Sequence, residues 1–200
     1  AAAADGQAAP DDGPHLPAPE PAETLLVAPD GRPCHASPGA LRLLLMAEGG
    51  ASPEALARTP RDLAQPLLAD VLPRLRHRPH DEVRICHSGP GGLLAVGARL
   101  LQGVATDGPA GQPLVHLHLR RLEPHRVALE RALRGLPLTP GQLAVCRALY
   151  QGLPQPRIGQ RLGVAPSTVV DHVRKAYRAL DLHGAGELRA LLDARIAQAA

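Results

Sequence analysis

The spacing of apolar residues changes along the chain, and each change marks a different kind of structure. Residues 24–37 hold two short apolar runs around a Pro-Asp-Gly turn, which predicts a β-hairpin. In residues 38–49, Leu41, Leu44 and Leu45 recur at helical spacing before two glycines. That pattern predicts a helix that ends at the glycines.

Proline interrupts the helical pattern that follows. Ser52 is placed to cap a helix over residues 52–57. Residues 61–76 continue with apolar residues at helical spacing, but they contain Pro66 and Pro73, and proline removes a backbone hydrogen bond. We therefore expect several short helical pieces here.

From residue 82 the apolar period becomes two. The segments 82–88, 93–103 and 113–123 are extended runs separated by turns rich in Gly and Pro, which predicts an antiparallel meander. Alternate residues of the third segment divide between two faces, with Val115, Leu117 and Leu119 on one and His116, His118 and Arg120 on the other. Strands and small helices together predict an α+β domain over residues 23–123.

The helical period returns near Pro124 and predicts a helical connector over residues 124–136. Leu129, Leu133 and Leu136 fall on one face of this helix. Their apolar stripe is suited to packing on either domain or to pairing with a second chain, and the sequence does not choose between these.

Residues 137–200 predict an all-α, four-helix domain. Thr139 suits a helix N-cap, and a second short helix stops at Gly163. A tight turn then leads to Pro166, which can start a third helix running to about Leu180. Two short helices joined by such a turn form a helix-turn-helix unit.

The third helix has an apolar face and a polar face. Val169, Val173, Ala176 and Leu180 form the face expected to be buried. The side chains expected to be exposed are Ser167, Thr168, Asp171, Arg174, Lys175 and Arg178. Such a helix can stay seated on its domain while it offers donors to base edges and cations to phosphates. Any amphipathic surface helix also turns its charges outward, so the helix alone does not establish DNA binding.

Charge and composition sharpen this prediction. The chain of 200 residues has a formal net charge of +3. Residues 136–200 hold eight basic and four acidic residues and so contribute +4, which leaves −1 for the rest. Phe and Trp are absent and Tyr occurs twice, so aromatic platforms for flavins or single-stranded bases are not expected.

Neither a metal site, a cofactor nor a membrane is expected. The three cysteines are widely spaced, without a zinc-ligand pattern. No apolar run reaches the roughly 18 to 20 residues that span a bilayer, and residues 1–22 are acidic where a signal peptide would be basic. We expect a cytoplasmic protein, and we expect residues 1–22, rich in Ala and Pro, to form a disordered tail or linker.

The C-terminal domain resembles the DNA-binding domain of LuxR-type transcriptional regulators. The motifs that carry the resemblance are "LTP" at 138–140, "GL" at 152–153, Ile158, "LGV" at 162–164, "STVVDH" at 167–172, Leu180 and "EL" at 187–188. The resemblance implies a dimer on an inverted repeat of double-stranded DNA. It assigns groove and backbone contacts to Ser167, Thr168, Val169, Asp171, Arg174 and Lys175. His172 matches the family's characteristic histidine. Arg157 and Arg178 are further cations that can contact DNA.

The N-terminal domain more weakly resembles a PAS-type sensor. "LLVAPDGRPCHAS" is similar to the opening hairpin of such domains, and "GPGGLLAVGARLL" with "PLVHLHLRRLEP" to their last strands. This implies a domain that senses a small-molecule or protein signal or mediates dimerisation. The predicted protein is a transcription regulator and not an enzyme.

Several alternatives remain beside this interpretation. The family commonly has cations where Val170, Ala179 and Ala185 stand and a serine where Ala165 stands, so a protein-interaction module with a degenerate helix-turn-helix is the second hypothesis. His87, His116 and His118 suggest a metal or haem site, although solvated strand residues also account for them. Cys86-His87-Ser88 suggests a catalytic nucleophile, although a hairpin turn also accounts for this segment. A phosphoacceptor receiver domain needs a lysine, and it is disfavoured because the only lysine, Lys175, lies in the C-terminal domain. An acyl-homoserine-lactone pocket would use Trp and Tyr, and it is disfavoured because residues 1–135 lack both.

Overall fold

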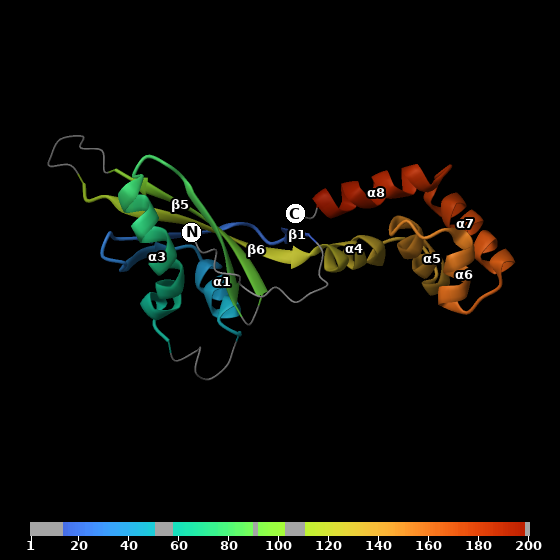
Figure 1. Cartoon of the computed structure of the whole chain (residues 1–200), viewed down its shortest axis with the longest axis horizontal. Helices are drawn as coiled ribbons and strands as arrows, with labels where there is room; N and C mark the ends of the chain where they lie inside the picture. The colour runs from blue at the N-terminus through green and yellow to red at the C-terminus, as the bar shows by residue number, and fades with distance from the viewer. Residues whose placement is uncertain (1–13, 51–57, 90–91, 103–110, 199–200) are drawn as a thin grey trace. The chain divides into compact units, whose positions relative to one another are not determined.

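The chain forms two compact units. The computed structural model describes residues 14–50, 58–89, 92–102 and 111–198. Contacts divide the chain into unit 1, Ala1–Glu123, and unit 2, Pro124–Ala200. The described part of unit 1 contains a sheet and helices, and that of unit 2 is helical (Figure 1). The expected mixed α+β fold is confirmed at this level. None of the described helices is long and apolar enough to cross a membrane.

Unit 1 is built on an antiparallel sheet. Its strands lie in the order β3-β2-β6-β5-β4, and β1 also pairs with β6. The strands are β1 His15–Pro17, β2 Glu23–Val27, β3 Pro33–Ala36, β4 Val83–Gly89, β5 Gly92–Leu101 and β6 Leu114–Pro124. The predicted hairpin is β2–β3, and the predicted meander is β4-β5-β6, so both are confirmed.

Helices α1 (Ala40–Ala47) and α3 (Pro60–His77) cover one face of this sheet (Figure 1). The strand residues buried beneath them are Leu25, Val27, Val83, Leu94, Val96, Ala98, Val115, Leu117 and Leu119. Removal of these side chains from water is the main stabilising contribution to the unit. The predicted alternation of β6 is confirmed, since Val115, Leu117 and Leu119 are buried and His118 is exposed.

Helix α3 corrects one prediction. It is continuous over Pro60–His77, with Pro66 and Pro73 inside it. The Thr59 hydroxyl and the Asp62 carboxylate cap its start reciprocally. One face of the helix is buried through Leu63, Ala64, Leu67, Leu68, Val71 and Leu75. That burial outweighs the hydrogen bonds lost at two prolines, which lie on the opposite, outward side. The helix predicted at Ser52 lies outside the described residues.

Residues 14–22 correct a second prediction. Residues 1–13 of the expected disordered tail lie outside the described residues. The remainder is ordered, because β1 pairs with β6 and the backbone N–H of Ala18 donates to the carbonyl of Arg121 at 2.9 Å. Glu20 accepts from the Arg121 guanidinium at 2.7 Å. Pairing and an ion pair far apart in sequence supply the order that the local composition does not predict.

Unit 2 consists of α4 His125–Arg134, α5 Pro140–Tyr150, α6 Gln155–Leu162, α7 Pro166–Leu180 and α8 Ala185–Gln198. The stripe on α4 packs within this unit, since Leu129 is 3% and Leu133 2% exposed and α4 contacts α8 and α5. Arg195 of α8 also donates to the carbonyl of Ala132 at 2.9 Å. Leu133 is therefore covered within a single chain.

Candidate nucleic-acid interface

Helices α6 and α7 meet through a tight turn, as the sequence predicts. Gly163 ends α6 in the left-handed conformation, with φ 67° and ψ 31°. The next N–H, of Val164, donates to the carbonyl of Gly159 at 3.0 Å. Ala165 then precedes Pro166, the first residue of α7, and supplies no side-chain cap. The turn is thus closed by backbone groups.

Gly159 lies against this turn, a contact that the sequence pattern did not predict. A Cβ atom at Gly159 would lie 3.0 Å from the carbonyl oxygen of Val164 and 3.5 Å from Cγ2 of Val169. The backbone of α6 therefore approaches the turn so closely that a side chain at Gly159 would displace its neighbour by a few tenths of an ångström. A lone glycine inside a helical pattern was the available signal.

The buried face of α7 lies on a small apolar core. Val169 and Ala176 are both 0% exposed and Val173 is 7% exposed. Val169 and Val173 pack with Val145, Ala148 and Ile158 of α5 and α6. Val169, which the resemblance assigned to DNA, therefore lies in the core with Val173 and off the outward surface of α7.

His172 is half-buried between α7 and α5. A Cβ atom at Gly141 would lie 3.1 Å from Cε1 and 3.2 Å from Nε2 of the His172 ring. Nδ1 of His172 is buried and has no hydrogen-bond partner among the described residues. The ring thus fills the gap left by Gly141, so His172 holds the two helices together and lies off the outward face that the resemblance assigned to DNA.

The outward side chains of α7 form a continuous surface, called here the recognition face. Its members are Ser167, Thr168, Val170, Asp171, Arg174, Lys175 and Arg178. Three cations and one carboxylate give it a formal charge of +2. The hydroxyls lie in the first turn and the cations in the second half of the helix. All of the predicted contacts on α7 except Val169 and His172 lie on this face.

Asp171 holds the cations together on the free protein. Its Oδ2 lies 2.7 Å from Nζ of Lys175, and its Oδ1 accepts from Arg174 at 3.1 Å. The hydrogen bond from Lys175, followed by that from Arg174, holds the pKa of Asp171 below its ordinary value. Such pairs are solvated and are readily exchanged for phosphate. Arg178 forms no ion pair with another described residue.

Helix α6 carries two further exposed cations, Arg157 and Arg161. Arg161 donates to the Gln151 side chain at 3.3 Å. Arg157 is exposed, so it is available to a phosphate as the sequence predicts.

A polar cluster lies among α4, α5 and α8. Tyr150 is 8% exposed, and its hydroxyl donates to Asp193 at 2.6 Å and lies 3.1 Å from Nε2 of His125. Arg189 donates to the Tyr150 carbonyl at 2.8 Å. Burial, followed by the bond to Asp193, raises the pKa of Tyr150 to about 12. The cluster ties α4, α5 and α8 together, and no local pattern predicted it because its members are distant in sequence.

The histidines of unit 1 do not converge. His116 and His118 lie on the face of the sheet away from α1 and α3, whereas His87 pairs with Leu94 in register and turns toward the helices, with Nε2 3.9 Å from Oε1 of Glu48. Among the described residues, no group of three His, Cys, Asp or Glu side chains could hold a metal. Strand alternation likewise separates His87 from Cys86 and Ser88.

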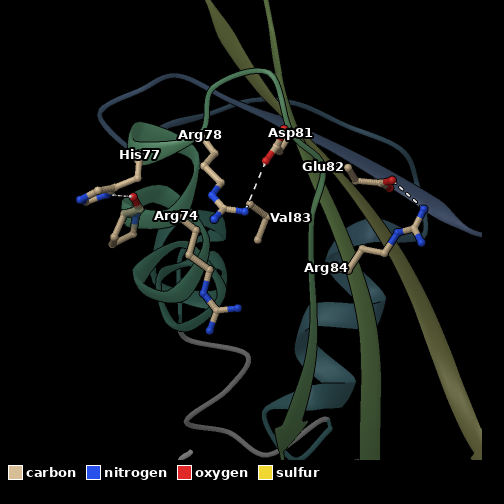
Figure 2. A pocket seen from close by; sticks show the side chains of 8 residues that line it. Arg74, His77, Arg78, Asp81, Glu82, Val83 and Arg84 are labelled. Atoms are coloured by element: carbon tan, nitrogen blue, oxygen red, sulfur yellow. Dashed lines mark hydrogen bonds and ion pairs between the residues drawn. The ribbon is translucent and has the colours of Figure 1, made fainter. Parts of the chain in front are cut away.

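A charged groove lies between the end of α3 and β4 (Figure 2). Its volume is about 450 Å³. In Figure 2 the side chains of Arg74 and Arg78 extend into the gap, and Arg78 pairs with Asp81 at 3.7 Å. Arg84 turns away to Glu82 at 2.7 Å. The Arg74, Arg78, Asp81 and Arg84 side chains are exposed and that of Glu82 is partly exposed, so water screens their charges and the groove lacks the desolvated polar group of a catalytic site.

Comparison with known proteins identifies no family. No family model and no curated protein matches the chain. A Vibrio cholerae VqmA–ligand–DNA complex is 18% identical, with a TM-score of 0.39, over 89% of this chain and 84% of that one. The Vibrio cholerae VqmA dimer without target DNA, described as a LuxR-type receptor, is 15% identical, with a TM-score of 0.33, over 88% of this chain and 83% of that one. A phage VqmA–DPO complex is 16% identical, with a TM-score of 0.34, over 88% of this chain and 84% of that one. Likeness this low carries no argument, so function is argued from the residues.

Proposed function

We propose that the chain is a DNA-binding transcription regulator in which α7 enters the major groove of double-stranded DNA. The observation that carries the proposal is the recognition face, which presents hydroxyls and cations outward from a helix whose opposite face is buried. The LuxR-type motifs between Leu138 and Leu188 agree with this assignment.

The chemistry of the recognition face suits a duplex. Ser167 and Thr168 lie at the helix N-terminus, where hydroxyl groups donate to phosphates or approach base edges. Arg174 has the bidentate geometry that pairs with guanine O6 and N7. Lys175, Arg178 and the more distant Arg157 are then the phosphate contacts, and such contacts supply most of the non-specific affinity.

Unit 1 is proposed as a PAS-like domain that senses a small-molecule or protein signal or holds two chains together. Its opening hairpin, intervening helices and final strands occur in the order that the PAS resemblance implies. A homodimer would place two copies of α7 about one DNA turn apart, roughly 34 Å, on an inverted repeat. The proposal includes no cofactor.

A second candidate is a protein-interaction module. It is favoured by the exposed apolar side chains of Val170, Ala179 and Ala185 at positions where the family commonly has cations. Salt separates the two candidates, since phosphate contacts weaken steeply with salt whereas an apolar interface does not.

The test is retention of duplexes from a random pool at about 50 and 200 mM salt, the range over which phosphate contacts lose most of their affinity. Arg174→Ala with Lys175→Ala is expected to abolish retention at about 200 mM salt in a folded protein, and loss of the Lys175 phosphate contact should reduce the salt slope of any residual binding by about 1. Arg74→Ala with Arg134→Ala removes two exposed cations elsewhere and should leave retention intact. Equal retention by both double variants would refute the proposal.

A further inference from the structure

One member of the recognition face is apolar. Val170 is 53% exposed, more than the exposed large hydrophobic residues Leu101, Val127 and Leu162, at 43%, 44% and 36%. A single exposed valine is ordinary on a protein surface. Val170 is unusual in its position, because it lies at the edge of the recognition face with Ser167 before it and Arg174 after it along the outward side of α7.

Folding does not account for this valine. Val169 and Val173 occupy the buried side of α7, so Val170 adds nothing to the core. A β-branched residue at an exposed position is also a weaker helix former than Lys, Arg or Glu. The isopropyl group is therefore left for a partner.

Val170 lies in line with two polar members of the recognition face. Ser167, Val170 and Arg174 are three and four residues apart, so they follow one another along the same side of the helix. A partner that meets this line must offer an acceptor, then an apolar group, then an acceptor again. In the major groove of DNA the apolar group is the C5 methyl of thymine, the only one that the bases present there.

We infer that Val170 reads a thymine methyl in the major groove, beside a guanine bound by Arg174. The inference rests on the proposed function and adds a base preference to it. Val170 and Arg174 are about one helical turn apart, roughly 5.4 Å, and base pairs are about 3.4 Å apart. The thymine therefore lies one or two base pairs from the guanine in each half-site.

The experiment measures how the full chain binds the duplex that is enriched from the random pool. Each thymine is replaced in turn by deoxyuridine, which removes only the methyl group, and affinity is measured by fluorescence anisotropy. In the wild-type chain, one replacement per half-site should weaken binding about fourfold, the effect of exposing one buried methyl-sized group.

In the Val170→Ala chain the same replacement should have no effect, because the contact is already lost. Val170→Thr keeps one methyl and should show an intermediate loss. Val127→Ala removes an exposed valine on α4 and should retain the full wild-type dependence. Far-ultraviolet circular dichroism checks that each variant is folded.

The possible results distinguish failure of thymine reading by Val170 from failure of DNA binding by the chain. If the folded chain retains no duplex, both are overturned. If duplexes are retained but deoxyuridine has no effect at any position, or if Val170→Ala keeps the wild-type penalty, Val170 does not read thymine and the regulator stands. If Val170→Ala instead shifts the sedimentation of the chain and leaves the uracil dependence unchanged, the side chain belongs to a protein interface and the inference is wrong.

Discussion

The position of α7 should depend on the absence of a single methyl group at Gly159. In Gly159→Ala, the added Cβ atom would lie 3.0 Å from the carbonyl oxygen of Val164. That oxygen belongs to the turn which the Val164 N–H closes onto Gly159 at 3.0 Å. This contact is tighter than ordinary van der Waals distance, and it is made with backbone, which gives way less easily than the end of a flexible side chain.

Two effects of opposite sign determine the change in stability. Replacing glycine by alanine inside a helix stabilises it by about 1 kcal/mol. Overpacking a tight contact costs about 1 to 3 kcal/mol, and a backbone contact falls in the upper half of that range. We expect unit 2 to lose about 1 to 2 kcal/mol of unfolding free energy.

Tyrosine fluorescence during urea unfolding measures this loss in unit 2 alone. The chain has two tyrosines and no tryptophan, and both tyrosines, Tyr150 and Tyr177, lie in unit 2. The matched control is Gly186→Ala in α8, where an added Cβ meets nothing within 4 Å and should stabilise by up to about 1 kcal/mol. If both variants are stabilised equally, the close approach of α6 to the turn does not exist.

Two further predictions concern charge and packing. Asp171→Asn should raise affinity for any duplex at low salt in an anisotropy assay, because Arg174 and Lys175 lose their carboxylate partner. Because the pKa of Asp171 is lowered, the wild-type protein keeps these ion pairs at neutral pH and loses them only as the pH falls through that lowered pKa. At such low pH the DNA affinities of the wild-type and variant proteins should become equal. Leu133→Asp should unfold unit 2, at a cost of at least about 2 to 5 kcal/mol, because Leu133 is 2% exposed. Native tyrosine fluorescence with altered sedimentation would contradict that expectation.

Local patterns in the sequence predicted most elements of both units. The alternation of apolar and polar residues predicted β4, β5 and β6. Helical spacing with a cap at Thr139 predicted α5. On α7 the same spacing separated the recognition face from the core. These predictions succeed because each depends on residues within one or two turns of each other.

Most of the errors share a physical cause, which is contact between distant residues. Pro66 and Pro73 remain inside α3 because the sheet buries the other side of that helix. The Glu20–Arg121 pair orders residues that composition assigned to a tail. The resemblance assigned Val169 and His172 to DNA by their place in a motif. Local helical spacing already places Val169 on the buried face, whereas the position of His172 depends on Gly141 of α5, which is distant in sequence.

Small residues allow the close approach of the helices in unit 2. Without Phe or Trp, the helices are held at short range by small residues, and the buried alanines are Ala128, Ala132, Ala148 and Ala176. At Gly141 and Gly159 the approach leaves no room for a methyl group without displacement of a neighbour. The placement of α7 therefore depends on backbone contacts, whereas its base preference depends on outward side chains. Changes at the glycines should disturb folding and DNA binding together, and changes at Val170, Arg174 or Lys175 should alter DNA binding in a folded protein.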